Sequence, residues 1–447
     1  MSLIKSPESQ TEQGFLFNLV FFIYQLGWCL GIPVAFIRLC WRARLEPGYR
    51  MHMLERLGFY SRRFQGHSPI WIHAVSVGET RAATFLIESL LKQNKKILLT
   101  HMTPTGRRTG ADIFKTAIAQ GQLIQAYLPY DFIWSVKSFL NYFSPKMGMM
   151  LETEAWPTHV VLAKKQHIPL FLINGRLSAR SARRIERFGH LGRILFQSFH
   201  QIFAQTIQDQ HRYESLGVKD CLVTGNLKFD IQLNPQLLQQ GQTWKVTALR
   251  GRAVICAAST REGEEVLIAQ AWKKIDQTQS PLLIMIPRHP QRFDVVEKII
   301  KAEGLSLQRR THLQINQNID AQVLLGDSMG EMALYYSMSD YVVMGGSLLP
   351  FGGQNLIEPC SIGKPVILGL HTFNFSKASQ DALALGAGWR LSNAVASVEI
   401  IQALANQINH LLSNPQEVAM ASRGAFQFTG THQGATKSTL ENLQDYL

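Results

Sequence analysis

The chain has 447 residues, of which 46% are hydrophobic and 17% charged, a composition typical of a globular protein with some membrane contact. Its 45 lysines and arginines exceed its 32 acidic residues and give a formal net charge of +13, which favours nucleic acid, phosphorylated substrates or anionic lipid as partners. The five scattered cysteines form no Cys-x-x-Cys pair, so the sequence excludes a disulfide framework and indicates a reducing compartment.

The N-terminal segment 15–37 is apolar apart from Asn18 and Gln25, and as a helix it is about long enough to cross a bilayer. We expect Pro33 to kink this helix or to end it early. No basic leader or small-residue cleavage site supports a signal peptide, while a buried amphipathic helix is the other alternative. Seven arginines follow the segment: Arg38, Arg42, Arg44, Arg50, Arg56, Arg62 and Arg63. Because basic residues flanking a membrane span stay on the cytoplasmic side, they place the rest of the chain there. The same arginines could bind anionic lipid headgroups. We therefore predict a membrane anchor in residues 1–40.

After the anchor, buried strands alternate with helices. Strands are expected at 70–74, 96–101, 147–151, 169–173, 201–204 and 222–224, and again at 252–257, 282–286, 322–325, 341–344 and 365–368. A polar helical stretch at 232–250 separates the two sets. The pattern predicts an α/β protein with two Rossmann-like domains, 41–231 and 252–447, which face each other across a cleft; the last helix could pack back on the first domain.

Two loops in the first half carry carboxylates directly after strands. Glu79 follows the strand-and-turn segment 71–78 at a helix start, where the helix N-terminus should help it to ionise, and it is a candidate general base. Glu152 and Glu154 follow another strand, with a spacing that in extended chain points both carboxylates to one side. The alternative for Glu79 is a simple charge at a helix N-terminus, and the alternative for Glu152 and Glu154 is helix capping.

Cations are the second feature of the first half. Lys228 lies near the domain junction, and the segment 174–189 holds five arginines that either bind phosphate or form a solvated helix face: Arg176, Arg180, Arg183, Arg184 and Arg187.

The second half contains the glycine-rich segment 342–369, which indicates a strand, a turn that approaches a ligand closely, and a helix start. Glu358 falls about one turn into that helix and could accept hydrogen bonds from ribose hydroxyls. Arg288 follows another strand, and Gly326 and Gly330 precede a helix, so together these loops would make a phosphate pocket. An ordinary strand–helix–strand crossover remains the alternative.

Taken together, these segments resemble one family, the 3-deoxy-D-manno-octulosonic acid (Kdo) transferases of lipopolysaccharide biosynthesis. The similar segments run in the family's order over nearly the whole chain: HAVSVGE (73–79), MTPTG (102–106), YLPYD (127–131), ETEAWP (152–157), GRLSARSAR (175–183), TGNLKFD (224–230), STREGEE (259–265), PRHPQRF (287–293), GDSMGEM (326–332), GGSLLPFGGQN (345–355) and HTFNF (371–375). The sequence departs from the usual pattern at Arg261, Gln354, Leu151 and Gly175.

The resemblance implies a GT-B glycosyltransferase fold and an inverting transfer of Kdo from CMP-Kdo to a phosphorylated lipid A precursor, lipid IVA. It implies Glu79 as the proton acceptor, and Glu152 and Lys228 as stabilisers of the transition state. The implied CMP contacts are Pro287, Arg288, Met329, Gly330, Glu331, Asn355, Leu356, Ile357 and Glu358.

Several further expectations complete this interpretation. The sequence has no Asp-x-Asp and no His-Glu-x-x-His motif, so we expect no cofactor and no metal. Nucleic acid is not an expected partner, because the arginines cluster beside the apolar segment and no zinc-finger or RNP motif is present. CMP-Kdo, the phosphorylated lipid and anionic membrane lipids are the expected partners, at the cytoplasmic face of a bacterial inner membrane. Another membrane-associated GT-B enzyme with a different nucleotide-sugar donor is the alternative, and the oligomeric state stays open.

Overall fold

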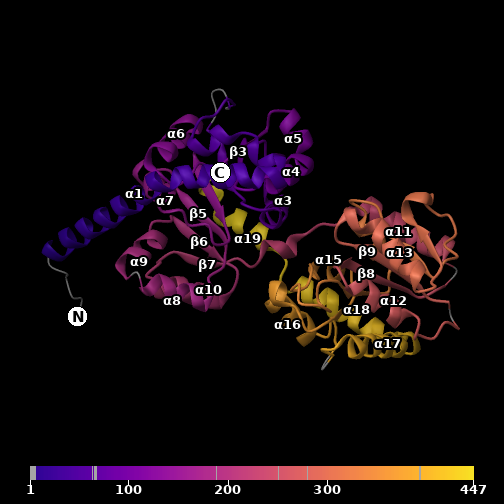
Figure 1. Cartoon of the computed structure of the whole chain (residues 1–447). Coiled ribbons are helices and arrows are strands. Elements are labelled where there is room, and N and C mark those ends of the chain that lie inside the picture. Colours follow the sequence, from indigo (N-terminus) through magenta and orange to yellow (C-terminus); the bar gives the residue numbers. More distant parts are fainter. Residues whose placement is uncertain are drawn as a thin grey trace, which may run out of the picture. The chain divides into compact units, whose positions relative to one another are not determined.

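The computed structural model describes residues 7–62, 64, 68–187, 189–249, 251–278, 280–391 and 394–447. Internal contacts divide the chain into two compact units. The first unit extends to Asp230 and also includes Gln433–Leu447, and the second comprises Ile231–His432 (Figure 1).

The first unit contains a parallel seven-stranded sheet in the order β3-β2-β1-β4-β5-β6-β7. Alternate residues of its central strands enter opposite cores: Trp71 packs on one face, whereas Ile70 and Ile72 pack on the other. Helices cover both faces, so these strands are apolar on both sides. The strands are β1 (Ile70–His73), β2 (Ile97–His101), β3 (Leu123–Tyr127), β4 (Met147–Leu151), β5 (Leu170–Gly175), β6 (Gln201–Ala204) and β7 (Cys221–Val223).

The helices of the first unit are mostly short, apart from the first. They are α1 (Pro7–Leu45), α2 (Val77–Ala82), α3 (Thr84–Lys92), α4 (Pro104–Ile113), α5 (Lys115–Ala119), α6 (Ile133–Phe143), α7 (Pro157–Lys165), α8 (Ala179–Arg187), α9 (His190–Gln197), α10 (Ile207–Ser215) and α19 (Ala435–Asn442). Single turns of 3₁₀ helix occur at η1 (Pro47–Arg50), η2 (Met53–Leu57), η3 (Leu227–Asp230) and η7 (Gln444–Tyr446).

The second unit repeats this architecture with the strand order β10-β11-β9-β8-β12-β13-β14. Its strands are β8 (Val254–Thr260), β9 (Leu282–Pro287), β10 (Leu307–Arg309), β11 (Val323–Leu325), β12 (Tyr341–Met344), β13 (Val366–Leu368) and β14 (Gly388–Arg390), all paired in parallel. Its helices are α11 (Pro235–Ala248), α12 (Glu264–Trp272), α13 (Phe293–Ala302), α14 (Met332–Met338), α15 (Ile357–Ser361), α16 (Ser376–Ala384), α17 (Ser397–Ser413) and α18 (Pro415–Gly430). The predicted α/β class with two parallel sheets is confirmed.

Three strands that the sequence did not predict, β3, β10 and β14, are all edge strands. An edge strand needs less apolar surface, and these three contain polar or intermediate positions such as Gln125, Gln308 and Arg390. Pro33 does not end the helix early, because α1 continues through it to Leu45. The exposed position of Pro33 leaves the packed face of the helix uninterrupted.

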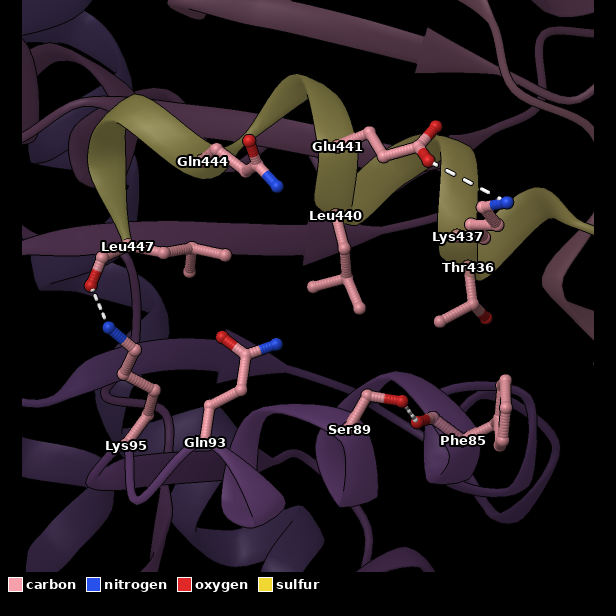
Figure 2. A pocket seen from close by; sticks show the side chains of 10 residues that line it. All are labelled: Phe85, Ser89, Gln93, Lys95, Thr436, Lys437, Leu440, Glu441, Gln444 and Leu447. Carbon is pink, nitrogen blue, oxygen red and sulfur yellow. Dashed lines mark hydrogen bonds and ion pairs between the residues drawn. The ribbon is translucent and has the colours of Figure 1, made fainter.

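The C-terminal segment is part of the first unit. The Asp230 carboxylate accepts hydrogen bonds from the main-chain N–H groups of Gly434 at 2.7 Å and Thr436 at 2.5 Å, and the Tyr446 hydroxyl lies 2.6 Å from His200 Nε2. Figure 2 shows the pocket of about 660 Å³ that α19 and α3 enclose, with Leu440 of α19 pointing toward α3. The lining of this pocket includes none of the predicted site residues.

Candidate active site

The strand order of the first unit reverses between β1 and β4. The chain builds β1, β2 and β3 outward in one direction and then returns to place β4 on the other side of β1. In open parallel sheets, ligands bind outside the carboxyl ends of the strands at such a reversal. Glu79 lies in the first turn of the helix that follows β1, and the loop after β4 carries Glu152 and Glu154, so the sheet brings these three carboxylates to one place.

Glu79 lies in the first turn of α2, which Ser76 caps. The Glu79 N–H donates to Ser76 Oγ at 3.5 Å, and the Glu79 carboxylate accepts a hydrogen bond from the Val75 N–H, in the manner of a capping box. Burial, followed by the negative charges of Glu152 and Glu154, raises the pKa of Glu79 to about 7. The expectation that Glu79 ionises readily was therefore wrong, because burial and two like charges outweigh the helix N-terminus.

Glu152 forms an ion pair with Lys228. The Lys228 Nζ lies 2.7 Å from Glu152 Oε1, and the two side chains are 32% and 19% exposed, so a ligand can still reach both. Glu152 has a φ of +58°, which differs from the extended conformation that the sequence predicted. Lys228 is held on η3, where its N–H donates to Asn226 Oδ1 at 3.0 Å.

Glu154 is the third carboxylate of this group. It accepts a hydrogen bond from Trp156 Nε1 at 2.7 Å, while burial raises its pKa. The arginine-rich segment contributes in a different way, because Arg176, Arg180, Arg183, Arg184 and Arg187 are all exposed, four of them on α8. The structure therefore agrees with a solvated basic face at that helix.

In the second unit the strand order reverses between β8 and β12. Gly345, directly after β12, passes so close to the end of β8 that a Cβ atom there would lie 2.3 Å from the Ser259 carbonyl oxygen. The glycine-rich loop 345–353 is organised by the buried Glu264 of α12. Its carboxylate accepts hydrogen bonds from the N–H groups of Gly346 at 2.7 Å, Leu348 at 3.0 Å and Leu349 at 3.4 Å.

Glu264 is a functional residue that the sequence did not identify. Its role could have been anticipated from the glycine-rich loop itself, because N–H groups buried in such a loop require an acceptor. No local pattern indicates which carboxylate supplies it.

The predicted donor residues lie on loops that leave the carboxyl ends of β9, β11 and β12. Pro287 ends β9, and the Arg288 N–H donates to the Thr260 carbonyl oxygen at 3.0 Å. After β11, Met329 is 70% exposed and Gly330 has a φ of +80°. The Glu331 carboxylate accepts a hydrogen bond from Arg310 Nη2 at 2.8 Å. Because neighbouring strands are parallel, the structure brings these three loops to one edge of the sheet.

The remaining predicted donor contacts surround the start of α15. The Ile357 N–H and the Asn355 Oδ1 are 3.1 Å apart, and Asn355 Nδ2 donates to Glu358 Oε1 at 3.1 Å. The side chains of Leu356 and Ile357 are both buried at 1% exposure. Both residues are therefore almost completely covered by their neighbours in this structure.

Two of the residues that depart from the family's usual pattern also lie at this edge. The Arg261 guanidinium stacks 4.8 Å from the Phe351 ring centre, and its Nη1 lies 2.9 Å from His289 Nε2. The Gln354 side chain lies beside Gly346, where an added Cβ would meet Gln354 Nε2 at 3.2 Å. Both departures are thus placed to influence the glycine-rich loop. Among the described residues, no group of three or more His, Cys, Asp and Glu side chains is arranged to hold a metal ion.

Comparison with known proteins identifies close relatives. A family model described as 3-deoxy-D-manno-octulosonic-acid transferase (kdotransferase) matches residues 51–231. A 3-deoxy-D-manno-octulosonic acid transferase of Bordetella pertussis is 41% identical over 384 residues, which are 85% of this chain and 88% of the relative. The enzyme of the same name from Haemophilus influenzae is 36% identical over 398 residues, 86% of this chain and 90% of the relative.

Among solved structures, a glycosyltransferase from Rickettsia africae superposes with a TM-score of 0.54 at 13% identity, covering 86% of this chain and 99% of that one. This similarity shows a GT-B-like fold alone. The identity to the two named relatives, over most of each chain, goes further: the chain belongs to the 3-deoxy-D-manno-octulosonic acid (Kdo) transferase family.

Proposed function

We propose that the chain is an inverting glycosyltransferase that moves Kdo from CMP-Kdo to lipid IVA, a phosphorylated lipid A precursor. The observation that carries this proposal is a carboxyl group with a pKa of about 7, Glu79, beside the Glu152–Lys228 ion pair at the strand reversal of the first unit. A general base works best when its pKa is close to the pH of the reaction.

In the proposed reaction, the Glu79 carboxylate takes the proton from an acceptor hydroxyl as its oxygen attacks the anomeric carbon of Kdo. The bond from that carbon to the CMP phosphate oxygen breaks, and CMP leaves with the electron pair. Lys228 supplies positive charge near the reacting groups, and Glu152 fixes its ammonium group at 2.7 Å. Glu152 and Lys228 thus stabilise the transition state as a pair.

CMP is assigned to the loops of the second unit. Arg288 is proposed to contact the phosphate, and Glu358, oriented by Asn355, to accept hydrogen bonds from the ribose. Six further residues complete the proposed contacts: Pro287, Met329, Gly330, Glu331, Leu356 and Ile357.

The site of action is proposed to be the cytoplasmic face of a bacterial inner membrane, where a lipid acceptor is available. Within the described residues, one helical segment, Leu19–Arg44, is long and apolar enough to cross a bilayer. Exposed arginines at its end support contact with anionic lipids.

Purified full-length protein should be incubated with CMP-Kdo and lipid IVA, and the lipid product examined by mass spectrometry. We expect CMP release together with a lipid that has gained Kdo, and an unchanged rate in EDTA because the sequence lacks an Asp-x-Asp motif. A parallel reaction with UDP-sugars tests the alternative donor. Transfer from a UDP-sugar but not from CMP-Kdo would overturn the proposal.

A further inference from the structure

Helix α1 has one face that is docked on the first unit through polar contacts. Gln25 is only 8% exposed; its Nε2 donates to Thr158 Oγ1 at 2.7 Å, and its Oε1 accepts from the Ile133 N–H at 2.8 Å. The neighbouring Tyr24 hydroxyl donates to Asp131 Oδ2 at 2.7 Å. A glutamine inside an apolar helix is costly in lipid unless it is paired, and here both ends of its amide are paired with the protein.

These contacts complete the hydrogen bonds of a buried polar cluster in the first unit. Asp131 is fully buried, and its Oδ1 lies 2.6 Å from Nδ1 of the equally buried His159. Tyr24 and Gln25 lie between this pair and the surroundings. Moving α1 away would leave the Asp131 carboxylate and the Thr158 hydroxyl without partners that they now have.

Farther along α1 the docked face is apolar. The Trp28 ring stacks on Tyr130 with ring centres 5.6 Å apart, and Leu39 and Ala43 join a core cluster with Tyr49. From Tyr24 to Ala43 the docked length is about 28 Å at 1.5 Å per residue. The hydrocarbon core of a bilayer is about 30 Å thick. If this segment crossed the bilayer, the buried polar group and much of the first unit would have to enter lipid with it.

The opposite face of α1 is an apolar stripe, which we call the outer stripe. Its members recur every three or four residues and range from 44% to 72% exposed: Leu19, Ile23, Leu26, Leu30, Val34, Ile37 and Trp41. Figure 1 shows the indigo helix running along the first unit, with its first turns extending beyond the sheet.

Exposed arginines lie at one end of this stripe, at Arg38, Arg42, Arg44 and Arg50. An apolar helix face with arginines and the exposed Trp41 at one end fits the interface of an anionic bilayer. A second copy of the chain would instead bring a second set of arginines to the same surface.

We propose that α1 lies along an anionic bilayer, with the outer stripe in one leaflet and the opposite face docked on the first unit, so that residues 24–43 do not cross the membrane. This inference deepens the membrane association proposed above. Its test measures the depth of the helix and does not measure the transfer of Kdo, so either proposal can fail without the other.

The chain provides its own probes for this test. Cys29 and Cys40 are exposed on α1, whereas Cys221, Cys256 and Cys360 are buried. The two exposed cysteines are eleven positions apart, which is about three helical turns, so they share one side of the helix but are separated by about 16 Å along it. Full-length Cys40→Ser protein would carry a fluorophore at Cys29, and Cys29→Ser protein at Cys40.

Each labelled protein is added to vesicles of phosphatidylethanolamine and phosphatidylglycerol that contain spin-labelled lipids at shallow or deep positions. We expect both fluorophores to be quenched from the same shallow depth. If the depths of the two fluorophores differ by about 16 Å, the full separation along the helix, then the helix crosses the bilayer and the proposal is overturned. Absence of quenching at both positions would overturn it as well, and a doubled mass in solution would then identify a second copy as the occupant.

A pair of matched variants tests the outer stripe itself. Val34→Glu places a charge in the stripe at a position that is 66% exposed, and Val398→Glu places the same charge on α17 of the second unit at a position that is 72% exposed. Both should keep the thermal unfolding of the parent. We expect Val34→Glu to weaken binding to these vesicles at least about tenfold, and Val398→Glu to leave it unchanged. Equal vesicle binding by the two variants would refute the outer stripe as the surface that contacts the membrane.

Discussion

The Lys228 ammonium lies 2.7 Å from the Glu152 carboxylate, although Lys228 follows the last strand of the first sheet and Glu152 follows a central one. The negative charge of Glu152 also lies close enough to Glu79 to help raise the pKa of the Glu79 carboxyl. One carboxylate therefore holds the proposed stabilising cation and tunes the proposed base. This arrangement makes the roles of the three residues separable by experiment.

Glu79→Gln is expected to reduce turnover by about 100-fold or more, since a glutamine cannot accept the proton. CMP affinity should remain, because the proposed donor contacts belong to the second unit. Steady-state kinetics and calorimetry with CMP measure the two effects. The control is Glu214→Gln on α10, an exposed carboxylate outside the site. Turnover close to that of the control would refute Glu79 as the base.

The rate should also depend on pH in a defined direction. If Glu79 acts as its carboxylate, kcat/KM rises as the pH passes through about 7 and levels off above it. Glu152→Gln removes a negative charge that raises this pKa, so the midpoint of the rise should move to lower pH, whatever the loss in kcat. A midpoint that moves upward or stays in place would contradict the assignment.

In the second unit, Arg288→Ala and Glu358→Ala should each weaken CMP binding by about tenfold or more. Only the Arg288→Ala effect should shrink when cytidine replaces CMP, because cytidine keeps the ribose and lacks the phosphate. Calorimetry with both ligands measures this difference. Arg423→Ala, an exposed position on α18, is the control. An equal loss for the two ligands in Arg288→Ala would place that residue away from the phosphate.

Glu264→Gln tests the carboxylate that organises the glycine-rich loop. A glutamine offers one oxygen where the carboxylate offers two, and its amide N–H groups would face N–H donors of the loop. We expect a loss of about 2 kcal/mol in unfolding free energy, together with weaker CMP binding. The neighbouring Glu262→Gln is the control, because the Glu262 side chain is 83% exposed. Unchanged melting of Glu264→Gln would show that the loop does not depend on this acceptor.

The docking of α1 predicts that Gln25→Leu destabilises the first unit by about 1–3 kcal/mol, since the Ile133 N–H loses its acceptor in a buried place. Thermal unfolding in detergent measures this loss, and CMP affinity should be retained. Cys29→Ser, on an exposed position of the same helix, is the control. A melting temperature equal to that of Cys29→Ser would mean that α1 is not held through Gln25.

The sequence by itself determined the two sets of central strands, because strands covered on both faces must be continuously apolar. It also named Glu79, Glu152 and Lys228, since each follows a recognisable strand or turn. The strands β3, β10 and β14 escaped prediction because an edge strand carries fewer apolar residues. Only the tertiary structure decided the pKa of Glu79, which depends on burial and on charges from a distant loop.

The same holds for Glu264 and for α1. The partners of Glu264 are N–H groups that follow another strand, and the partners of Gln25 belong to α6 and α7. Local pattern describes α1 as an apolar helix long enough to cross a membrane, because periodicity and length are properties of one segment. Which face of that helix is docked, and which face remains for lipid, depends on contacts between residues far apart in the chain, and folding alone brings those residues together.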